Sequence, residues 1–399
     1  MYTRKPIIVI GAGLSGLAVA AAMAALRLPI VILEKQDEAS YRKPFQDGRS
    51  LAVSLGSSQW LESWGVWGNV FEDAQPILDI RVVDKSSPQS IHFENSKQGL
   101  PMGYICPIDS IKEGLLKQLA TYPWVTFQFN TTILKLDNQR SEVSVTLEDG
   151  NTIGGELAVL ADGRLSQFRE ALGIKSIVVP YRQSALSFTI SHEMAHGGLA
   201  LERFLPDGPF AVLPMKGDYL SSIVFTLPEA VAPLYLTMPE AEFNTVLQER
   251  VGDYLGKVSL HSKRFSYPLR LAYASCFYSN RVALIGDAAH GVHPLAGQGF
   301  NLGIRDIACL VKQINKAQLV GLSIANDKVL RDYHRLRQGD SLAMTLATDA
   351  INRLFSNNHL PLSLLRRMGL SAVNRIDPLK DYFMRHAMGV TSFLQPEEV

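Results

Sequence analysis

The sequence predicts an α/β fold: a parallel sheet, an inserted and mostly antiparallel β domain, and a helical carboxyl-terminal segment. Three observations support this class. Residues 6–34 read as strand, glycine turn, helix and strand, the order of a parallel βαβ unit. Residues 171–269 contain alternating runs such as SALSFTISHE and YLSSIVFTL, typical of antiparallel strands. Residues 341–399 are expected to be helical.

Length and composition limit the classes of protein. The 399 residues suit two or three linked domains, and 47% apolar with 19% charged residues indicates a globular chain. A net charge of +1 argues against nucleic acid as a partner. The three cysteines form no CxxC pair, so we expect neither a disulfide framework nor a zinc site. His192 and His196, with Glu193 between them, could suggest a metal, but coincidence is the favoured interpretation, and no metal site is expected.

The apolar amino-terminal stretch could also be a signal peptide, since Arg4 and Lys5 precede it. The run begins with a β-type segment, however, and three glycines interrupt it. No stretch of the chain reaches the ~18 uninterrupted apolar residues of a spanning helix. We therefore expect a cytoplasmic protein. Any contact with the inner membrane would be peripheral.

The first motif is a glycine turn between two strands. We expect a strand over Ile7–Ile10, a helix over about Leu14–Leu26, a second strand over Ile30–Leu33, and an acid, Glu34, directly after it. The turn has the GxGxxG spacing, with these residues: Gly11, Gly13, Ser15 and Gly16. In this context the motif indicates a Rossmann-like dinucleotide site.

The chemistry of the motif narrows the ligand. Gly11 permits the tight turn, Gly13 lets the backbone approach a pyrophosphate, and Gly16 allows close packing of helix and strand. Glu34, followed by Lys35, would accept hydrogen bonds from a ribose diol and disfavour a 2′-phosphate. The prediction is therefore NAD or FAD. The alternative is a tight turn without a ligand.

A second stretch, RVALIGDAAHGVHPLAGQGFNLG at residues 281–303, has the features of a flavin site. A strand over Val282–Ile285 ends at Gly286 and Asp287, an acid suited to a ribityl hydroxyl. Gly297 and Gly299 leave room for a flat ring against the backbone. The helix that begins near Gly299 would direct its N–H groups at the negative charge of a reduced flavin.

These motifs resemble a known family. GDAAHGVHPLAGQGFNLGIRD looks like the second FAD-binding motif of the class A flavoprotein aromatic hydroxylases, which have the p-hydroxybenzoate hydroxylase fold. VLADGRLSQFRE, residues 159–170, resembles the family's DG motif, beginning at Asp162 and Gly163. DGRSLAVSLGSSQWLESWGVW at 47–67, LERFLPDGPFAVLP at 201–214 and the tail are similar to the ubiquinone-biosynthesis hydroxylases.

The resemblance implies FAD as cofactor and NAD(P)H as co-substrate. In the family, NAD(P)H reduces FAD, O₂ adds at C4a, and the hydroperoxide transfers oxygen to an electron-rich phenol. Arg49 would bind the FAD pyrophosphate. Pro294 would shape the pocket over the ring, and the backbone from Gly299 to Asn301 would stabilise the reduced flavin. The remaining cofactor contacts at this end would be Gly286, Asp287, Gly297, Gln298 and Phe300.

The same resemblance predicts a discontinuous domain organisation. The FAD-binding domain would comprise residues 1–75, 103–170 and 270–340, and the substrate domain 76–102 and 171–269. Residues 341–399 would form the helical segment, including an apolar cluster from Leu360 to Met368 that suits core packing, an oligomer contact, or a membrane or protein surface. Pro107 and Ile108 depart from the subfamily's usual polar pair, and Asp109 or Lys112 could supply the missing contact.

The leading functional hypothesis is hydroxylation of a polyprenylated phenol on the route to ubiquinone. The alternatives are a hydroxylase of a small soluble aromatic, a flavin-binding scaffold of a quinone-synthesis complex, and an oxidase or dehydrogenase. A membrane surface, a protein complex and a homo-oligomer stay open as partners. No catalytic base is assigned: His290 and His293 are more typical of packing or capping residues, and Arg203 suits either the active site or a rim.

Overall fold

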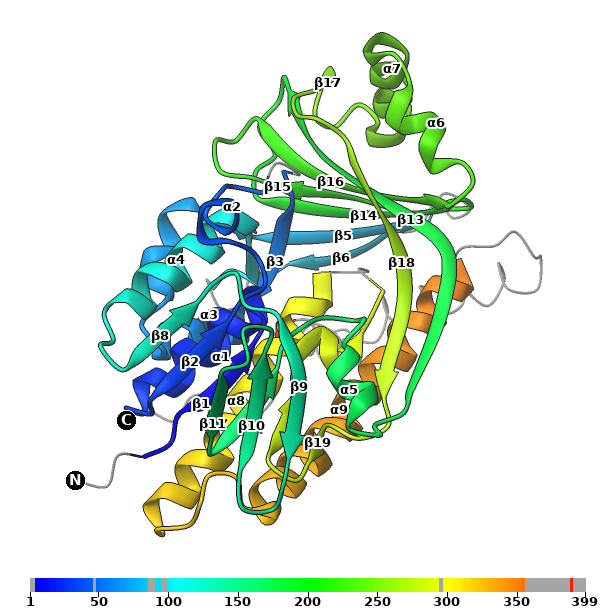
Figure 1. Ribbon diagram of the computed structural model, residues 1–399. Helices are drawn as coiled ribbons and strands as arrows, with labels where there is room; N and C mark the ends of the chain where they lie inside the picture. Colours follow the sequence, from blue (N-terminus) through cyan, green and yellow to red (C-terminus); the bar gives the residue numbers. More distant parts are fainter. Residues whose placement is uncertain are drawn as a thin grey trace.

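The computed structural model describes residues 4–45, 48–84, 90–94, 100–293, 297–355 and 388–389. Two large sheets organise this part of the chain (Figure 1), one largely parallel and one largely antiparallel. Pro294 lies outside the described residues, and so does the cluster from Leu360 to Met368.

The six-stranded sheet lies in the lower half of Figure 1. Its strands, in spatial order, are β19 (Tyr278–Ser279), β20 (Val282–Leu284), β12 (Leu157–Leu160), β1 (Ile7–Ile10), β2 (Ile30–Leu33) and β8 (Val125–Gln128). All neighbours run parallel except β19 and β20. Every residue of β1 and β12 is buried, because helices cover this sheet, and this explains their continuous apolar runs.

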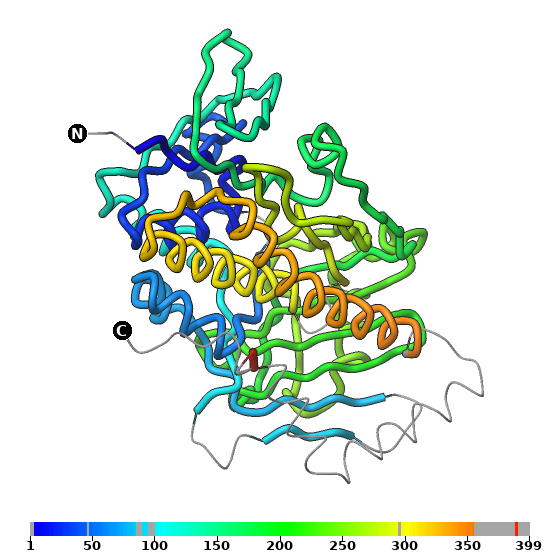
Figure 2. The backbone as a smooth tube through the Cα atoms, turned by 90° about the horizontal axis from the view of Figure 1, so that it is seen from below, coloured from blue at the N-terminus to red at the C-terminus, as the bar shows by residue number. Residues whose placement is uncertain are grey.

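Three helices pack together beside this sheet: α1 (Leu14–Ala25), α4 (Ile108–Ala120) and α8 (Gln298–Leu319). The middle of the three is α1, an alanine-rich helix whose small side chains allow neighbours on both sides to come close. A long helix, α9 (Asp327–Phe355), runs beside α8 (Figure 2).

The nine-stranded sheet lies above the first in Figure 1. Its strands are β21 (His290–Gly291), β18 (Phe265–Ala274), β13 (Ser176–His192), β16 (Leu220–Pro228), β15 (Gly208–Pro214), β14 (Leu199–Leu205), β5 (Asp79–Asp84), β6 (Ser90–Glu94) and β17 (Val258–Leu260), which pairs with β13. Only β14 and β5 pair in parallel. One face packs against α6 (Ala232–Thr237) and α7 (Glu240–Val251) around Phe188, Phe225 and Phe243.

Smaller elements complete the described structure. One three-stranded sheet consists of β3 (Ser50–Ser54), β7 (Gly103–Pro107) and β4 (Gln75–Ile77), and another of β9 (Ile133–Asn138), β10 (Val143–Leu147) and β11 (Thr152–Gly155). The short helices are α2 (Glu38–Tyr41), α3 (Leu55–Ser63), α5 (Gln167–Ala171) and three 3₁₀ turns, η1 (Trp67–Asn69), η2 (Phe71–Asp73) and η3 (Gly286–Ala288).

The predicted fold class is confirmed: a parallel α/β core, a second and mostly antiparallel sheet, and a helix entering the carboxyl-terminal segment. The exact domain limits stay a prediction. Both predicted insertions nevertheless contribute to the nine-stranded sheet, since β5 from residues 76–102 pairs with β14 from residues 171–269. Among the described residues, none of the helices combines the length and apolar character that crossing a membrane requires.

A buried ionic network joins α8 and α9 to the strand end after β20. Asp306 of α8 is fully buried and accepts hydrogen bonds from the Gly286 amide at 3.0 Å and the Arg337 guanidinium at 2.8 Å. His290 Nε2 lies 2.7 Å from the same carboxylate. Burial alone would raise the pKa of Asp306, but His290 and Arg337 together hold it below its usual value.

Asp306→Ala should therefore destabilise the protein by about 3–5 kcal/mol, because it removes the buried carboxylate that Arg337, His290 and the Gly286 amide share. Urea unfolding measures this free energy. Glu113→Ala, which breaks the exposed Glu113–Lys117 pair on α4, is the matched control and should cost less than about 1 kcal/mol. Equal losses in the two variants would contradict a structural role for the network.

Candidate functional site

The site lies where four parallel strands end side by side. Four neighbouring strands of the six-stranded sheet meet here, in the spatial order β20, β12, β1 and β2. A predicted cofactor residue follows closely after the end of each strand. These residues are Gly11 after β1, Glu34 after β2, Asp162 after β12 and Gly286 with Asp287 after β20. The strand order reverses beside β1, and such a reversal opens a crevice for ligands at the carboxyl edge.

The glycine turn leaves the amino end of α1 open. Gly13 is the N-cap of α1 and is exposed; no side chain caps the helix, and a Cβ added to Gly13 would meet no atom within 4 Å. Gly16 differs, because a Cβ there would lie 1.9 Å from the Gly11 carbonyl oxygen. Gly16 thus serves packing, whereas Gly13 exposes unpaired N–H groups to a free space that suits a pyrophosphate.

Glu34 holds the glycine turn to the end of β2. One carboxylate oxygen accepts a hydrogen bond from the Ala12 amide at 2.9 Å, and the other accepts one from the Gln36 amide at 3.0 Å. Tyr41 donates its hydroxyl hydrogen to the Ala12 carbonyl at 2.8 Å. Each carboxylate oxygen keeps a second lone pair for a ribose hydroxyl. Lys35, also a predicted contact, is exposed beside this edge.

The first and second motifs touch through Ser15. Its Oγ lies 2.6 Å from the position of a Cβ on Gly286 and 3.3 Å from that of a Cβ on Gly303. The two glycines therefore leave the space that the Ser15 side chain occupies. Ser15, predicted as a cofactor contact, lies between the motifs and sets their separation.

The DG motif is tied to the second motif by two arginines. Arg164 donates from Nε to the Asp287 carboxylate at 2.8 Å. The buried Arg169 donates to the Ala288 carbonyl at 2.9 Å and to the Arg164 carbonyl at 3.0 Å. Asp162 is half-buried, and burial raises the pKa of its carboxyl group. Gly163 beside it has open space around its α-carbon.

The amino end of α8 is anchored to β3. Asn301 accepts a hydrogen bond from the Ser54 amide at 2.9 Å and donates to the Ala52 carbonyl at 2.8 Å. Its side chain thus positions the helix, and only its backbone is left for the predicted catalytic role. Gly297 is the N-cap of α8, no side chain caps this helix, and its first turn holds no acid. A Cβ added to Gly299 would meet no atom within 4 Å.

The other predicted residues at this end surround that first turn. Gln298 is buried, and Phe300 packs partly buried against the main core. A Cβ added to Gly297 would lie 2.8 Å from Cβ of Ala52, so α8 begins directly on β3. Pro294 lies outside the described residues, and its predicted role stays a prediction.

The segment that carries Arg49 is held by α4. The Arg49 guanidinium lies 5.8 Å from the ring centre of Phe45 and 5.9 Å from that of Tyr267. The Phe45 amide donates to the Asp109 carboxylate at 2.8 Å, and Lys112 donates to the Tyr41 carbonyl. Asp109 and Lys112 therefore support this segment, next to the place where Pro107 and Ile108 replace the usual polar pair.

The three remaining candidate side chains, His290, His293 and Arg203, have different surroundings. His290 belongs to the buried Asp306 network, as expected of a packing residue. His293 is buried with its ring edge on Tyr181, and burial lowers its pKa to about 4. Arg203 hydrogen-bonds the Arg250 carbonyl on the α7 side of the nine-stranded sheet, away from the strand ends described above.

Sequence reasoning missed Tyr41 and assigned no contact to Arg169. Tyr41 is the only tyrosine between Glu34 and Arg49, but its bond to Ala12 depends on how the loop returns across the glycine turn. Arg169 lies inside the quoted DG motif, and its position close to Asp162 in the sequence is a signal that could have been used. Its burial is visible only in the structure.

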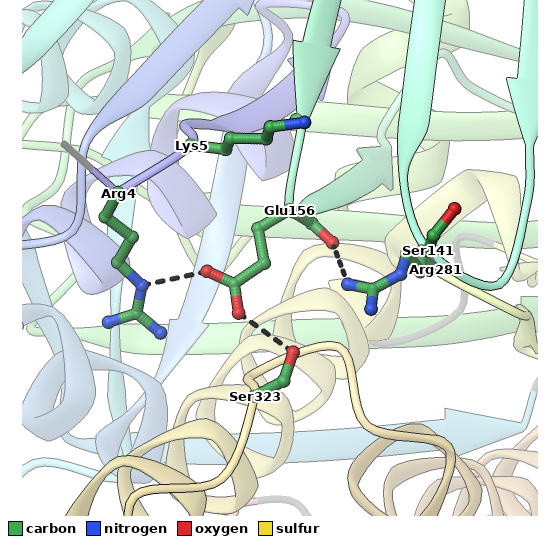
Figure 3. Close-up of a pocket in the computed structure, with 7 residues that line it drawn as sticks. Arg4, Lys5, Ser141, Glu156, Arg281 and Ser323 are labelled. Atoms are coloured by element: carbon green, nitrogen blue, oxygen red, sulfur yellow. Dashed lines mark hydrogen bonds and ion pairs between the residues drawn. The ribbon is translucent and has the colours of Figure 1, made fainter. Parts of the chain in front are cut away.

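A separate pocket of about 320 Å³ lies at the opposite edge of the six-stranded sheet (Figure 3). Its side chains come from segments that precede the strands, and they mostly satisfy one another. Glu156 accepts from Arg4 and from Ser323, both at 2.9 Å, and Arg281 donates to the Glu156 carbonyl at 3.0 Å. This pocket is a structural junction and is distinct from the crevice at the strand ends.

The geometry fits a flavin dinucleotide. Two open helix ends, α1 and α8, lie at the same edge of the sheet, with Glu34, Asp162 and Asp287 as acceptors between and beside them. Open space over Gly13 and Gly299 lets a ligand approach both helix ends. The fold and this arrangement together define a dinucleotide-binding flavoprotein.

Comparison with known proteins agrees with this class. Residues 4–345 match the family described as an FAD binding domain. The chain is 42% identical over 391 residues to the ubiquinone hydroxylase UbiL of Rhodospirillum rubrum, covering 98% of this chain and 91% of that protein. It is 32% identical to the mitochondrial ubiquinone biosynthesis monooxygenase COQ6 of Xenopus tropicalis, covering 96% and 92%.

Among solved structures, the p-nitrophenol 4-monooxygenase PnpA of Pseudomonas putida aligns with a TM-score of 0.77. It covers all of both chains at 18% identity, which supports the shared fold. The chain therefore belongs to the FAD-binding family of the class A monooxygenases, and it is an FAD-dependent monooxygenase. The predicted family and the predicted cofactor, FAD, are confirmed.

Gly13→Ala and Gly16→Ala should separate binding from folding. Gly13→Ala should leave the unfolding free energy of the apoprotein within about 0.5 kcal/mol of wild type and weaken FAD binding at least tenfold, because the methyl group enters only the ligand's space. Gly16→Ala should lose several kcal/mol of stability, since its methyl group meets the Gly11 carbonyl. Unfolding curves and FAD titration measure both. A Gly13→Ala variant that binds FAD normally would exclude the proposed cradle.

Proposed function

We propose that the protein hydroxylates a polyprenylated phenol in ubiquinone biosynthesis, with NAD(P)H as reductant and O₂ as the source of oxygen. The main support is similarity that runs almost end to end. The ubiquinone hydroxylase of Rhodospirillum rubrum covers 98% of this chain, which includes the nine-stranded sheet as well as the FAD motifs. The similarity therefore supports a shared class of substrate as well as a shared cofactor.

The apolar surroundings of the site also favour a prenylated substrate. The nine-stranded sheet packs against β3 and β7 through a cluster that contains Ile77, Met102, Ile105 and Ala200. Ala52 of β3, the residue on which α8 begins, packs against this cluster. An apolar wall thus adjoins the helix end proposed to face the flavin, and such a wall stabilises a hydrocarbon chain by burying it.

In this proposal the chain's residues bind and orient the cofactor. The amino end of α1 and Arg49 bind the pyrophosphate, Glu34 the ribose, and Asp287 the ribityl chain. FAD, when bound and reduced, supplies the oxygen chemistry that side chains lack. The first-turn N–H groups of α8, from Gly299 to Asn301, stabilise negative charge at the ring, because the helix dipole is positive there.

Isotope incorporation tests the reaction. The purified holoenzyme, given NAD(P)H, 2-geranylphenol and ¹⁸O₂, should form a product that carries one ¹⁸O atom, as measured by mass spectrometry. 4-Hydroxybenzoate is the soluble comparison and should react at least tenfold more slowly, because it buries no prenyl chain. Oxidation of the phenol without ¹⁸O would indicate an oxidase or dehydrogenase instead.

A genetic control separates catalysis from scaffolding. In cells that lack the gene, the Gly13→Ala variant should accumulate as folded protein and fail to restore ubiquinone. Restoration by this flavin-deficient variant would favour the scaffold alternative over the hydroxylase.

A further inference from the structure

Strand β14 presents a carboxyl group to the apolar face of the nine-stranded sheet. Side chains alternate along the strand. Leu201 and Leu205 pack in the cluster with α6 and α7, and Arg203 contacts Arg250 on the same side. Glu202 lies on the other face, where its neighbours along the strand, Ala200 and Phe204, pack in two separate apolar clusters.

The neighbours of Glu202 across the sheet are apolar as well. It pairs with Val82 of β5 on one side and with Ala211 of β15 on the other, and Ala211 in turn pairs with Val224 of β16. Within the described part of the chain, the Glu202 side chain has no hydrogen bond and no ion pair. A carboxyl group in such surroundings costs stability unless a ligand uses it.

This face is incompletely packed around Glu202. The side chains of Glu202, Leu213 and Val224 keep an intermediate accessible surface, whereas Val212 and Ile223 on the opposite face are buried. At the same time, burial raises the pKa of Glu202 to about 7. The Glu202 side chain is thus partly accessible although the surrounding protein desolvates its carboxyl group.

The apolar face around Glu202 is continuous with the predicted flavin end of the site. Ala200 and Leu213 lie on the same face as Glu202, both toward the start of β14, and they share a cluster with Ala52. Ala52 contacts the start of α8 at Gly297 and accepts a hydrogen bond from Asn301. Glu202 is therefore linked through one layer of apolar side chains to the helix end that would face the isoalloxazine ring.

We propose that Glu202 is the catalytic base that binds the phenolic hydroxyl of the substrate and removes its proton. This inference rests on the proposed function. The phenol O–H bond breaks, the proton passes to a carboxylate oxygen of Glu202, and the electron pair stays on the phenolate oxygen, which makes the ring more nucleophilic toward an electrophilic oxygen. The apolar wall around Glu202 accommodates the prenyl chain.

Other titratable groups on the surrounding elements do not replace Glu202. Asp84 of β5 lies on the same face of the sheet as Glu202. Tyr104 of β7 packs against the apolar cluster that contains Ala200. Arg353 lies on α9, next to Leu354 of the cluster that contains Phe204. β15 and β16 carry no ionisable side chain. Burial is the cause of the raised Glu202 pKa, and none of these groups contributes to it.

The pH dependence of kcat/KM for 2-geranylphenol tests the assignment, because it reports ionisation of the free enzyme. In the wild-type holoenzyme, kcat/KM should fall tenfold per pH unit below about 7, where Glu202 becomes protonated, and level off above. Glu202→Gln should lower kcat/KM at pH 8 by roughly 10²–10⁴-fold and abolish this acid limb. Glu202→Asp should retain an acid limb at reduced rate.

Protein stability provides a readout independent of turnover. The folded state binds the Glu202 proton more tightly than the unfolded state, in which the pKa is about 4.5. The wild-type protein therefore loses stability as pH rises from about 4.5 to about 7, relative to Glu202→Gln. Thermal unfolding of both holoproteins at pH 5 and pH 8 should show the variant gaining on wild type at the higher pH.

Glu249→Gln, on the exposed face of α7, is the matched control and should change neither profile. If the wild-type enzyme hydroxylates the phenol and Glu202→Gln keeps the acid limb, the assignment of Glu202 is wrong, while the proposed function stands. A wild-type enzyme that hydroxylates no phenol would overturn the proposed function, and the assignment with it.

Discussion

The close approach of two backbone segments at one edge of the parallel sheet is the constraint on which the rest of the structure depends. Gly16 packs against the Gly11 carbonyl, and Ser15 fills the space beside Gly286 and Gly303. A larger residue at either contact would separate α1 from β1 or the first motif from the second. Because the two helix ends sit on these contacts, the distance between the proposed phosphate and flavin sites follows from them.

The neighbouring polar contacts make this edge rigid. Glu34 and Tyr41 hold the glycine turn from one side, and Arg169 holds the DG loop on the second motif from the other. Behind them, Asp306 ties the strand end after β20 to α8 and α9. A site whose donors are held by such a supporting layer needs little reorganisation when the ligand binds.

The two sheets contribute different chemistry. The parallel sheet supplies backbone donors and carboxylates at its strand ends, where we propose that the charged cofactor binds. The antiparallel sheet supplies an apolar face on which the Glu202 side chain has no polar partner among the described residues. An oxygen-inserting enzyme requires both, since the cofactor provides the reactive group and the apolar face orients the substrate and excludes water.

The sequence by itself determined the local parts of this protein. The βαβ order, the GxGxxG turn, Glu34 at the next strand end and the helix after Gly297 all follow from short-range spacing, and the structure has them where the spacing predicts. Asp287 was predicted as a strand-end acid for the same reason, whereas Asp162 was predicted from the resemblance of its segment to the DG motif. Periodicity and glycine placement are encoded within a few residues, so they can be read without knowing the fold.

Only the tertiary structure decided which distant residues share a surface. Arg203 and Glu202 are adjacent in sequence, so alternation along a strand puts them on opposite faces, but only the packing of the sheet places Arg203 on the side of α7 and Glu202 on the other side. Likewise, the contact of Ser15 with Gly286 and the bond from Tyr41 to Ala12 depend on strand order and loop path. A shift of one residue in strand register would move every side chain of the strand to the opposite face of the sheet, and long-range packing sets that register.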